Sequence, residues 1–286
     1  MDYLNRLLVS VQRQSFRDFE VIIVDQSQNP SVIDIINQYT KSFQIIHLIQ
    51  AESGASLARN AGGNLARGEI LFWPDEDCLL SEINLLMLVD KEFKIDPDLG
   101  GLIVVARDED GVPFHRWLPH QTRILTALDA LTRATEWAMF IRREIFYFNV
   151  GFDCNFGPGK STLWAAGESA DLCLRMLNNQ HKLVLTPEIY VNHPNPIIQF
   201  NNQTQLRKGY LYAAGMGAAI RKNNISSIAF FMYLAIILRA IGWNFLSLKI
   251  ADTKFHLYRL IGVIIGWRQY HKYNWHQQRN NKTHLP

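Results

Sequence analysis

Four short apolar runs, separated by segments with helical character, most constrain the fold of this chain. The runs cover residues 19–25, 43–50, 68–75 and 100–107. Continuous apolar runs of this length are typical of strands buried on both faces of a sheet. The intervening segments 2–14, 31–40, 53–66 and 81–98 carry apolar residues at helical spacing or small residues suited to close packing. This alternation predicts an α/β fold with a mixed, mostly parallel sheet and flanking helices.

The third apolar run ends in an acidic cluster. The sequence LFWPDEDC places Asp75, Glu76 and Asp77 after strand-like residues, and Asp25 ends the first run. Ligands of parallel sheets bind at the carboxyl ends of the strands, so these acids lie on the expected binding edge. An isolated Asp-x-Asp pair is most often a solvated acidic turn. Carboxylates at its first and third positions also suit a hard divalent cation, with nucleotide phosphates completing the oxygen shell.

The charge of the chain is divided unevenly. Beyond residue 200 there are 12 Lys or Arg residues and one acid, Asp252, whereas the first 200 residues hold 17 basic and 25 acidic residues. A basic segment of this kind faces an anionic partner, either nucleic acid or a membrane surface. The three cysteines are far apart, at positions 78, 154 and 173, and form neither a disulfide framework nor a C-x-x-C metal site.

Residues 226–270 are the most apolar part of the basic segment. The uninterrupted stretch Ile228–Leu238 has 11 residues and ends at Arg239, which is short of the roughly 20 residues that a spanning helix needs. Aromatic residues beside Arg and Lys suit the lipid headgroup layer; here they are Trp243, Tyr258, Trp267 and Tyr270. We expect one or two helices lying in the membrane interface. A helical hairpin packed on the body and a true membrane span are the alternatives.

Four motifs in order carry a resemblance to a known family. They are EVIIVDQS, SGASLARNAGGNLARGEILFWPDEDC, VGFDCNFGPG and GESADLCLRML. Together they resemble the family 2 glycosyltransferases, which are inverting enzymes of the GT-A fold. The resemblance covers about residues 2–195, and its most specific part runs from Gly54 to Asp77. It implies a GT-A catalytic domain over residues 1–200 and a basic, helical, membrane-associating region over residues 201–286.

The resemblance also implies roles for individual residues at the nucleotide-sugar site. Asp25 corresponds to the acid that reads the nucleotide base, and Arg59 to a residue of the nucleotide pocket. Asp75 and Asp77 match the Asp-x-Asp motif, with Asp77 the metal ligand and Asp75 nearer the ribose and the metal. His193 corresponds to a late histidine that reaches the metal or the diphosphate in some relatives. The implied cofactor is Mg²⁺ or Mn²⁺, between which the sequence does not choose.

The catalytic base is implied by the GESAD motif. Many relatives have two successive acids here, whereas this chain has Glu168 followed by Ser169. We therefore take Glu168 as the base and Asp171 as the alternative. Asp171 also has a structural explanation, because an acid in the first turn of a helix interacts favourably with the helix dipole. Arg175 is spaced to form an i,i+4 ion pair with it.

These motifs imply transfer of a sugar from a nucleoside-diphosphate sugar to a saccharide or polyprenyl-linked acceptor, with inversion. The implied setting is cell-surface polysaccharide synthesis at the cytoplasmic face of the membrane, with peripheral or monotopic attachment. One alternative is a non-catalytic relative that keeps the fold. The other is a nucleic-acid binder, but the long apolar runs after residue 226 fit lipid better than bases. Small residues at Ala213, Gly215 and Gly217 predict close helix contact in this region.

Two further expectations concern the sheet and the middle of the chain. Relatives carry an apolar strand and a short turn before the helix that starts here at Asp2. Either upstream sequence supplies that strand or the nucleotide pocket is altered, and in both cases we expect a vacant or substituted central position in the sheet. Residues 107–165 are less periodic and rich in aromatic residues, Gly and Pro. They are expected to form a lid or the second half of a cleft.

Overall fold

The computed structural model describes residues 2–27, 29–114, 119–159, 162–194 and 202–270. In the first part of the chain, strands and helices alternate as the apolar runs predict. The elements are α1 (Asp2–Gln12), β1 (Glu20–Asp25), α2 (Ser31–Asn37), β2 (Gln44–Ile49), α3 (Ala55–Leu65), β3 (Ile70–Phe72), α4 (Leu85–Ile95) and β4 (Leu99–Arg107).

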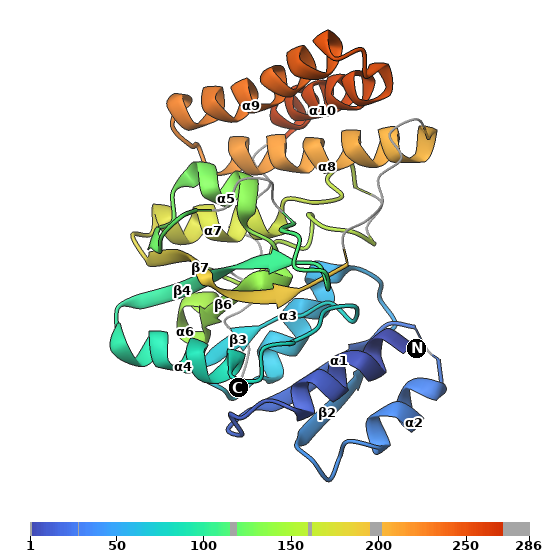
Figure 1. The fold of residues 1–286 in the computed structure, drawn as a ribbon, viewed down its shortest axis with the longest axis vertical. Coiled ribbons are helices and arrows are strands. Elements are labelled where there is room, and N and C mark those ends of the chain that lie inside the picture. The colour runs from blue at the N-terminus through green and yellow to red at the C-terminus, as the bar shows by residue number, and fades with distance from the viewer. Residues whose placement is uncertain (1, 28, 115–118, 160–161, 195–201, 271–286) are drawn as a thin grey trace.

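The later elements complete a second sheet and add a helical layer. They are β5 (Arg123–Ile124), α5 (Ala127–Arg133), the 3-10 helix η1 (Glu136–Ala138), β6 (Met139–Arg142), α6 (Arg143–Phe148), α7 (Glu168–Asn178), β7 (Lys182–Asn192), α8 (Gln203–Lys222), α9 (Ser227–Leu246) and α10 (Ile250–Gln269). In Figure 1, α8, α9 and α10 lie above α5 and α7, which in turn lie above the sheet.

The larger sheet has the strand order β3-β6-β4-β7-β5. Strand β4 pairs parallel with β7, but β6 pairs antiparallel with both β3 and β4, and β5 pairs antiparallel with β7. The sheet is mixed, as predicted, although parallel pairing is confined to β1–β2 and β4–β7. Strand β6 lies antiparallel between β3 and β4, so β3 and β4 run in the same direction.

Strand β6 also corrects the interpretation of residues 107–165. Its residues Met139, Phe140 and Ile141 are at most 1% exposed and form part of the hydrophobic core. This part of the chain therefore supplies a central strand of the sheet. Residues 115–118 and 160–161, which belong to the expected lid, lie outside the described residues.

Strands β1 and β2 form a separate parallel sheet of two strands. Residues 2–12 are helical, and among the described residues no strand joins β1 to β3. This division into two sheets agrees with the predicted vacant position. Helix α3 packs against β1, and a Cβ atom added at Gly62 would lie 3.4 Å from Val24. The small residues of segment 53–66 thus allow close helix–strand contact.

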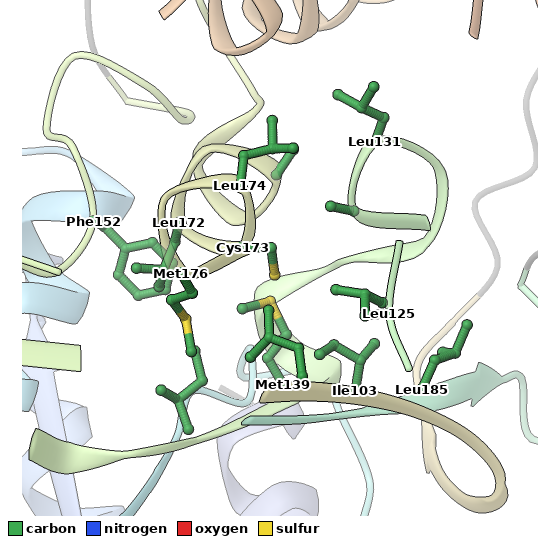
Figure 2. Packing of buried hydrophobic residues seen from close by; sticks show 14 of the residues in the cluster. Ile103, Leu125, Leu131, Met139, Phe152, Leu172, Cys173, Leu174, Met176 and Leu185 are labelled. Atoms are coloured by element: carbon green, nitrogen blue, oxygen red, sulfur yellow. The ribbon is translucent and has the colours of Figure 1, made fainter. Parts of the chain in front are cut away.

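Both faces of the larger sheet are covered by apolar helices. Helix α4 and part of α1 bury Leu85, Val89 and Leu8 against one face. Helices α5 and α7 cover the other face. Figure 2 shows Cys173 and Met176 of α7 in the core above Met139 and Ile103 of the sheet. This packing fixes the axis of α7 and therefore the position of Glu168, which is the first residue of that helix.

Helices α8 and α10 pack at very short distance. A Cβ atom at Gly217 would lie 2.1 Å from the Val263 carbonyl oxygen, and one at Gly266 would lie 1.9 Å from that of Ala214. Only glycine permits such backbone approach, so the close helix contact predicted from the small residues is confirmed. Ala213, Ile220 and Val263 extend the core of the sheet into this layer.

Helix α9 is long and apolar enough to cross a membrane by length and composition alone, and it is the one such helix among the described residues. It buries Tyr233 and Ile237, while Ile228 and Leu246 are 73% and 80% exposed. Trp243 is exposed as predicted, but Tyr270 is buried beside Trp164, so it does not reach the surface expected of it. The end of the basic segment, residues 271–286, lies outside the described residues.

Candidate active site

Arg59 of α3 is the centre of a group of carboxylates. Its Nη2 atom lies 3.0 Å from Asp75 Oδ1 and 2.7 Å from Glu136 Oε1, and its Nη1 atom lies 3.3 Å from Glu168 Oε1. The backbone oxygen of Arg59 accepts a hydrogen bond from Trp73 Nε1, which ties α3 to the end of β3. Burial alone would lower the pKa of Arg59, but Glu136, Asp75 and Glu168 together raise it. The arginine is therefore a permanent cation that holds three acids together.

Glu136 is a site residue that the sequence analysis missed. It lies in η1 immediately before β6, and its Oε2 atom accepts a hydrogen bond from Ser169 Oγ. Because β6 runs antiparallel to β3 and β4, its amino end lies at the same edge as their carboxyl ends. In the sequence, Glu136 is visible only as an acid that precedes an apolar strand. Its place in the site can be predicted only when the direction of β6 in the sheet is known.

Glu168 is the most deeply buried carboxylate of this group, with 4% of its side chain exposed. Burial, followed by the charge of Glu136, raises its pKa to about 8, although Arg59 acts in the opposite direction. Burial also raises the pKa of Asp75 to about 6, again against the effect of Arg59. A carboxylate with a pKa near neutrality can accept a proton and return it, as a general base must.

Asp77 and His193 form the neighbouring part of the site. His193 Nε2 lies 3.3 Å from Asp77 Oδ1, and its ring stacks on Trp137 with centroids 4.2 Å apart. His193 Nδ1 lies 2.9 Å from the Pro194 carbonyl oxygen, which can only accept. When Nδ1 is the donor there, Nε2 carries a lone pair that faces the carboxylate of Asp77. Two acceptors at this distance are the arrangement expected of a pair of metal ligands.

The donor atoms fit a divalent cation. Ligand atoms of Asp77, Cys78 and His193 lie within 4.8 Å of one another. Carboxylate oxygen and imidazole nitrogen are common metal ligands, and the second ring nitrogen of His193 is held by a carbonyl, as metal-binding histidines usually are. Cys78 is fully buried, and burial raises the pKa of its thiol. The thiol therefore belongs to the core, and Asp77 and His193 are the residues that would hold the ion, with Asp75 beside them.

The other predicted residues lie in two separate places. Asp25 ends β1 in the smaller sheet, where its Oδ1 atom accepts hydrogen bonds from the backbone and hydroxyl of Ser27 and its Oδ2 atom lies 3.4 Å from His47 Nε2. Burial would raise the pKa of Asp25, but these hydrogen bonds and His47 lower it. It is an anion ready to accept hydrogen bonds, and its strand β1 lies in a different sheet from β3, the strand that precedes Asp75.

Asp171 is directed away from the carboxylate group. It is fully buried and accepts from Arg175 Nε at 2.9 Å, confirming the predicted i,i+4 pair. Lys222 of α8 lies 2.8 Å from Asp171 Oδ2 and 2.7 Å from Asp153 Oδ2. Burial opposes ionisation of Asp171, but Arg175 and Lys222 together lower its pKa. The geometry favours Glu168 over Asp171 as the residue facing a substrate.

Comparison with known proteins identifies relatives of this chain. A relative from Bacillus subtilis (strain 168), the glycosyltransferase TuaG named for teichuronic acid biosynthesis, is 31% identical over 138 residues, which are 46% of this chain and 52% of TuaG. The poly(ribitol-phosphate) beta-glucosyltransferase of Bacillus spizizenii is 31% identical over 108 residues, or 35% of this chain and 17% of that protein. The matched regions thus span about half of these relatives or less.

A solved structure shares the fold. The mannosyltransferase PcManGT from Pyrobaculum calidifontis, in complex with GDP-Man and Mn²⁺, superposes with a TM-score of 0.62 at 15% identity, covering 94% of this chain and 84% of that one. The sequence profile of glycosyl transferase family 2 matches residues 1–154, a region that contains Arg59, Asp75, Asp77 and Glu136. With its GT-A fold and this match over more than half its length, the chain belongs to glycosyltransferase family 2.

Proposed function

We propose that this protein transfers a sugar from a nucleoside-diphosphate sugar to an acceptor hydroxyl with inversion at the anomeric carbon. The observation that carries the proposal is the convergence of Asp75, Glu136 and Glu168 on Arg59, next to the Asp77–His193 pair. A buried carboxylate beside a candidate cation site supplies the two functions that such a transfer needs. These are a base for the acceptor and a positive charge for the leaving group.

Glu168 is the proposed base. Its carboxylate removes the proton of the acceptor hydroxyl as that oxygen attacks the anomeric carbon from the face opposite the diphosphate. The new carbon–oxygen bond forms as the bond from the anomeric carbon to the phosphate oxygen breaks, and the diphosphate leaves with the electron pair. Arg59 orients Glu168 through the Nη1 contact at 3.3 Å. Base catalysis of this type typically contributes about 10²–10⁴-fold to the rate.

The proposed cofactor is Mg²⁺ or Mn²⁺, held by Asp77 and His193 with Asp75 beside them. Bound there, the ion would neutralise charge on the leaving diphosphate. Asp25 is proposed to read the nucleotide base, since its carboxylate can accept hydrogen bonds from exocyclic amino or imino groups. The GDP-Man and Mn²⁺ named in the PcManGT complex are consistent with this class of donor and cofactor.

The proposed acceptor is a cell-surface saccharide or its lipid-linked precursor. The names of TuaG and of the poly(ribitol-phosphate) enzyme place those relatives in the synthesis of anionic cell-surface polymers. We propose residues 1–200 as the catalytic domain and 201–286 as the region that attaches it to the cytoplasmic face of the membrane. The exposed apolar residues of α9, among them Ile228, Phe231 and Leu246, support peripheral or monotopic attachment.

Donor turnover is the experiment that tests the proposal. Detergent-purified full chain is incubated with nucleotide sugars and Mn²⁺ or Mg²⁺, with and without an extract of lipid-linked saccharides, and released nucleoside diphosphate is measured. Release that requires both the metal and Asp77 is expected, with Asp77→Ala inactive and Glu76→Ala active, because Glu76 is exposed and Asp77 faces His193. Absence of release under every condition would indicate a non-catalytic member of the family.

A further inference from the structure

The first half of α8 extends over the carboxylate group. A Cβ atom added at Gly215 would lie 1.9 Å from the carbonyl oxygen of Ala166, two residues before Glu168. Further along the same helix, Lys222 reaches Asp171 in the first turn of α7. The two contacts show that α8 and α7 run in the same direction. Residues of α8 before Gly215 therefore extend beyond the first residue of α7, on the side of the active site (Figure 1).

Tyr212 lies on this part of α8. It lies three residues before Gly215, which is about 4.5 Å along a helix axis. Its side chain is partly open to solvent. Burial and then the charges of Glu168, Glu136 and Asp75 raise the pKa of the Tyr212 phenol. Within the described part of the chain its hydroxyl has no hydrogen-bond partner, so it is available to a ligand of the site.

Lys208 lies one turn earlier on the same face of α8. Its Nζ atom is 5.2 Å from the centroid of the Tyr212 ring, a cation–π contact that holds the ammonium near the site. The side chain is exposed, and among the described residues it has no acidic partner. Its ammonium group is therefore free to meet an anionic ligand.

The negative charge of the site decides which acceptors need a nearby cation in order to bind. The centre holds Asp75, Glu136 and Glu168 around one arginine, and Asp77 is close by. A neutral acceptor sugar can approach this group freely, whereas a phosphate-bearing acceptor is repelled unless a cation meets it. Lys208 is an exposed cation beside Tyr212, and the charges of these carboxylates contribute to the raised pKa of the Tyr212 phenol.

We propose that Lys208 and Tyr212 form an acceptor subsite for a phosphate-bearing saccharide. Lys208 binds the phosphate group as a point charge, and the Tyr212 hydroxyl hydrogen-bonds to a sugar hydroxyl close to Glu168. The inference rests on the proposed transferase function and adds the chemical class of the acceptor. It makes α8 a part of the active site as well as a support for α7.

A binding titration tests this without requiring turnover. Glucose 1-phosphate and the neutral methyl glucoside are titrated calorimetrically into the full chain in detergent, with a nucleoside diphosphate and Mn²⁺ present to occupy the donor side. We expect the phosphate probe to bind more tightly, and Lys208→Ala to weaken it about tenfold, the usual effect of losing a charged hydrogen bond, without changing the neutral probe. Tyr212→Phe should weaken both probes.

Arg207→Ala is the matched control. Arg207 is the adjacent cation on the same turn, but it lines a different pocket of about 220 Å³ together with Leu206, Tyr210 and Tyr258. Binding in Arg207→Ala should equal that of the wild type. Equal binding of both probes by the wild type, no effect of Lys208→Ala, or the same loss in both variants would each overturn the proposal. Failure of the transferase function itself would appear separately, as absent metal-dependent release of nucleoside diphosphate.

Discussion

Arg59 Nη1 lies 3.3 Å from Glu168 Oε1, and through this contact the arginine orients the proposed base. The same guanidinium also contacts Glu136 and Asp75, so one cation compensates three acids. This relationship joins the stability of the fold to the proposed catalytic role of the site.

The first prediction concerns Arg59→Met. Removing the cation leaves three carboxylates together, and breaking a buried ion pair in this way costs about 3–5 kcal/mol. We expect that loss in the free energy of unfolding measured by urea denaturation, together with loss of donor turnover. Arg67→Met is the control, because the Arg67 side chain is 67% exposed beside Glu20 and should contribute less than about 1 kcal/mol. Similar losses in the two variants would contradict the central role of Arg59.

The second prediction is a pH–rate profile governed by Glu168. The base must be ionised, and burial and Glu136 raise its pKa to about 8. The value of kcat/KM should therefore rise as the pH increases toward 8 and level off above it, since this ratio reports the ionisation of the free enzyme. Steady-state release of nucleoside diphosphate between pH 5.5 and 9.5 would measure it. A profile that is flat from pH 6 upward would exclude Glu168 as the base.

The ionisation of Glu168 should also change how the free energy of unfolding depends on pH. The folded state holds the Glu168 proton up to about pH 8, whereas the unfolded chain releases it near the ordinary glutamate pKa of 4.5. The folded state thus binds more protons between these limits, and stability falls as the pH rises through this window. Glu168→Gln carries no charge, so it should be more stable than the wild type at pH 9, and the difference should shrink toward pH 4.5. Urea unfolding at both pH values measures it, and a constant difference would contradict the assignment.

The sequence predicted the elements whose evidence is local. The apolar runs, the acids after β3 and the Asp171–Arg175 pair can all be found by spacing along the chain, and the structure places them as expected. Glu136 could not be found in this way, because its position depends on the antiparallel insertion of β6 between β3 and β4. Long-range pairing decides that insertion, and no local pattern in residues 139–142 reports strand direction.

The role of the helical region was likewise only partly predictable. The small residues of α8 indicated close packing, but not that Gly215 would meet Ala166 or that Lys222 would reach Asp171. In the sequence, Lys222 precedes two asparagines at the end of a helix, a pattern that is typical of a solvent-exposed helix terminus. Its burial follows from tertiary contact with two acids that lie 18 residues apart in the sequence, Asp153 and Asp171.

The fourth prediction tests that contact. In Lys222→Met, Asp153 and Asp171 would remain buried with less compensation, and we expect a loss of about 3–5 kcal/mol in the free energy of unfolding. Lys182→Met is a suitable control, because Lys182 is 41% exposed in its ion pair with Asp96 and should cost less than about 1 kcal/mol. Chemical denaturation followed by circular dichroism compares the two. An equal cost would mean that the Lys222 contacts contribute little to the folded state.

The final prediction tests the docking of α8 on α7. In Gly215→Ala the new methyl group would lie 1.9 Å from the Ala166 carbonyl oxygen, which is backbone and cannot rotate away, so the two helices must separate. We expect a loss of about 1–3 kcal/mol from overpacking. Turnover should fall as well, because Glu168 follows this contact directly.

Gly242→Ala on α9 is the matched control. Its added Cβ meets nothing within 4 Å, and higher helix propensity should leave it as stable as the wild type or slightly more stable. Melting temperature and release of nucleoside diphosphate are measured for both variants. If Gly215→Ala kept wild-type turnover while losing stability, α8 would support the fold without positioning the active site.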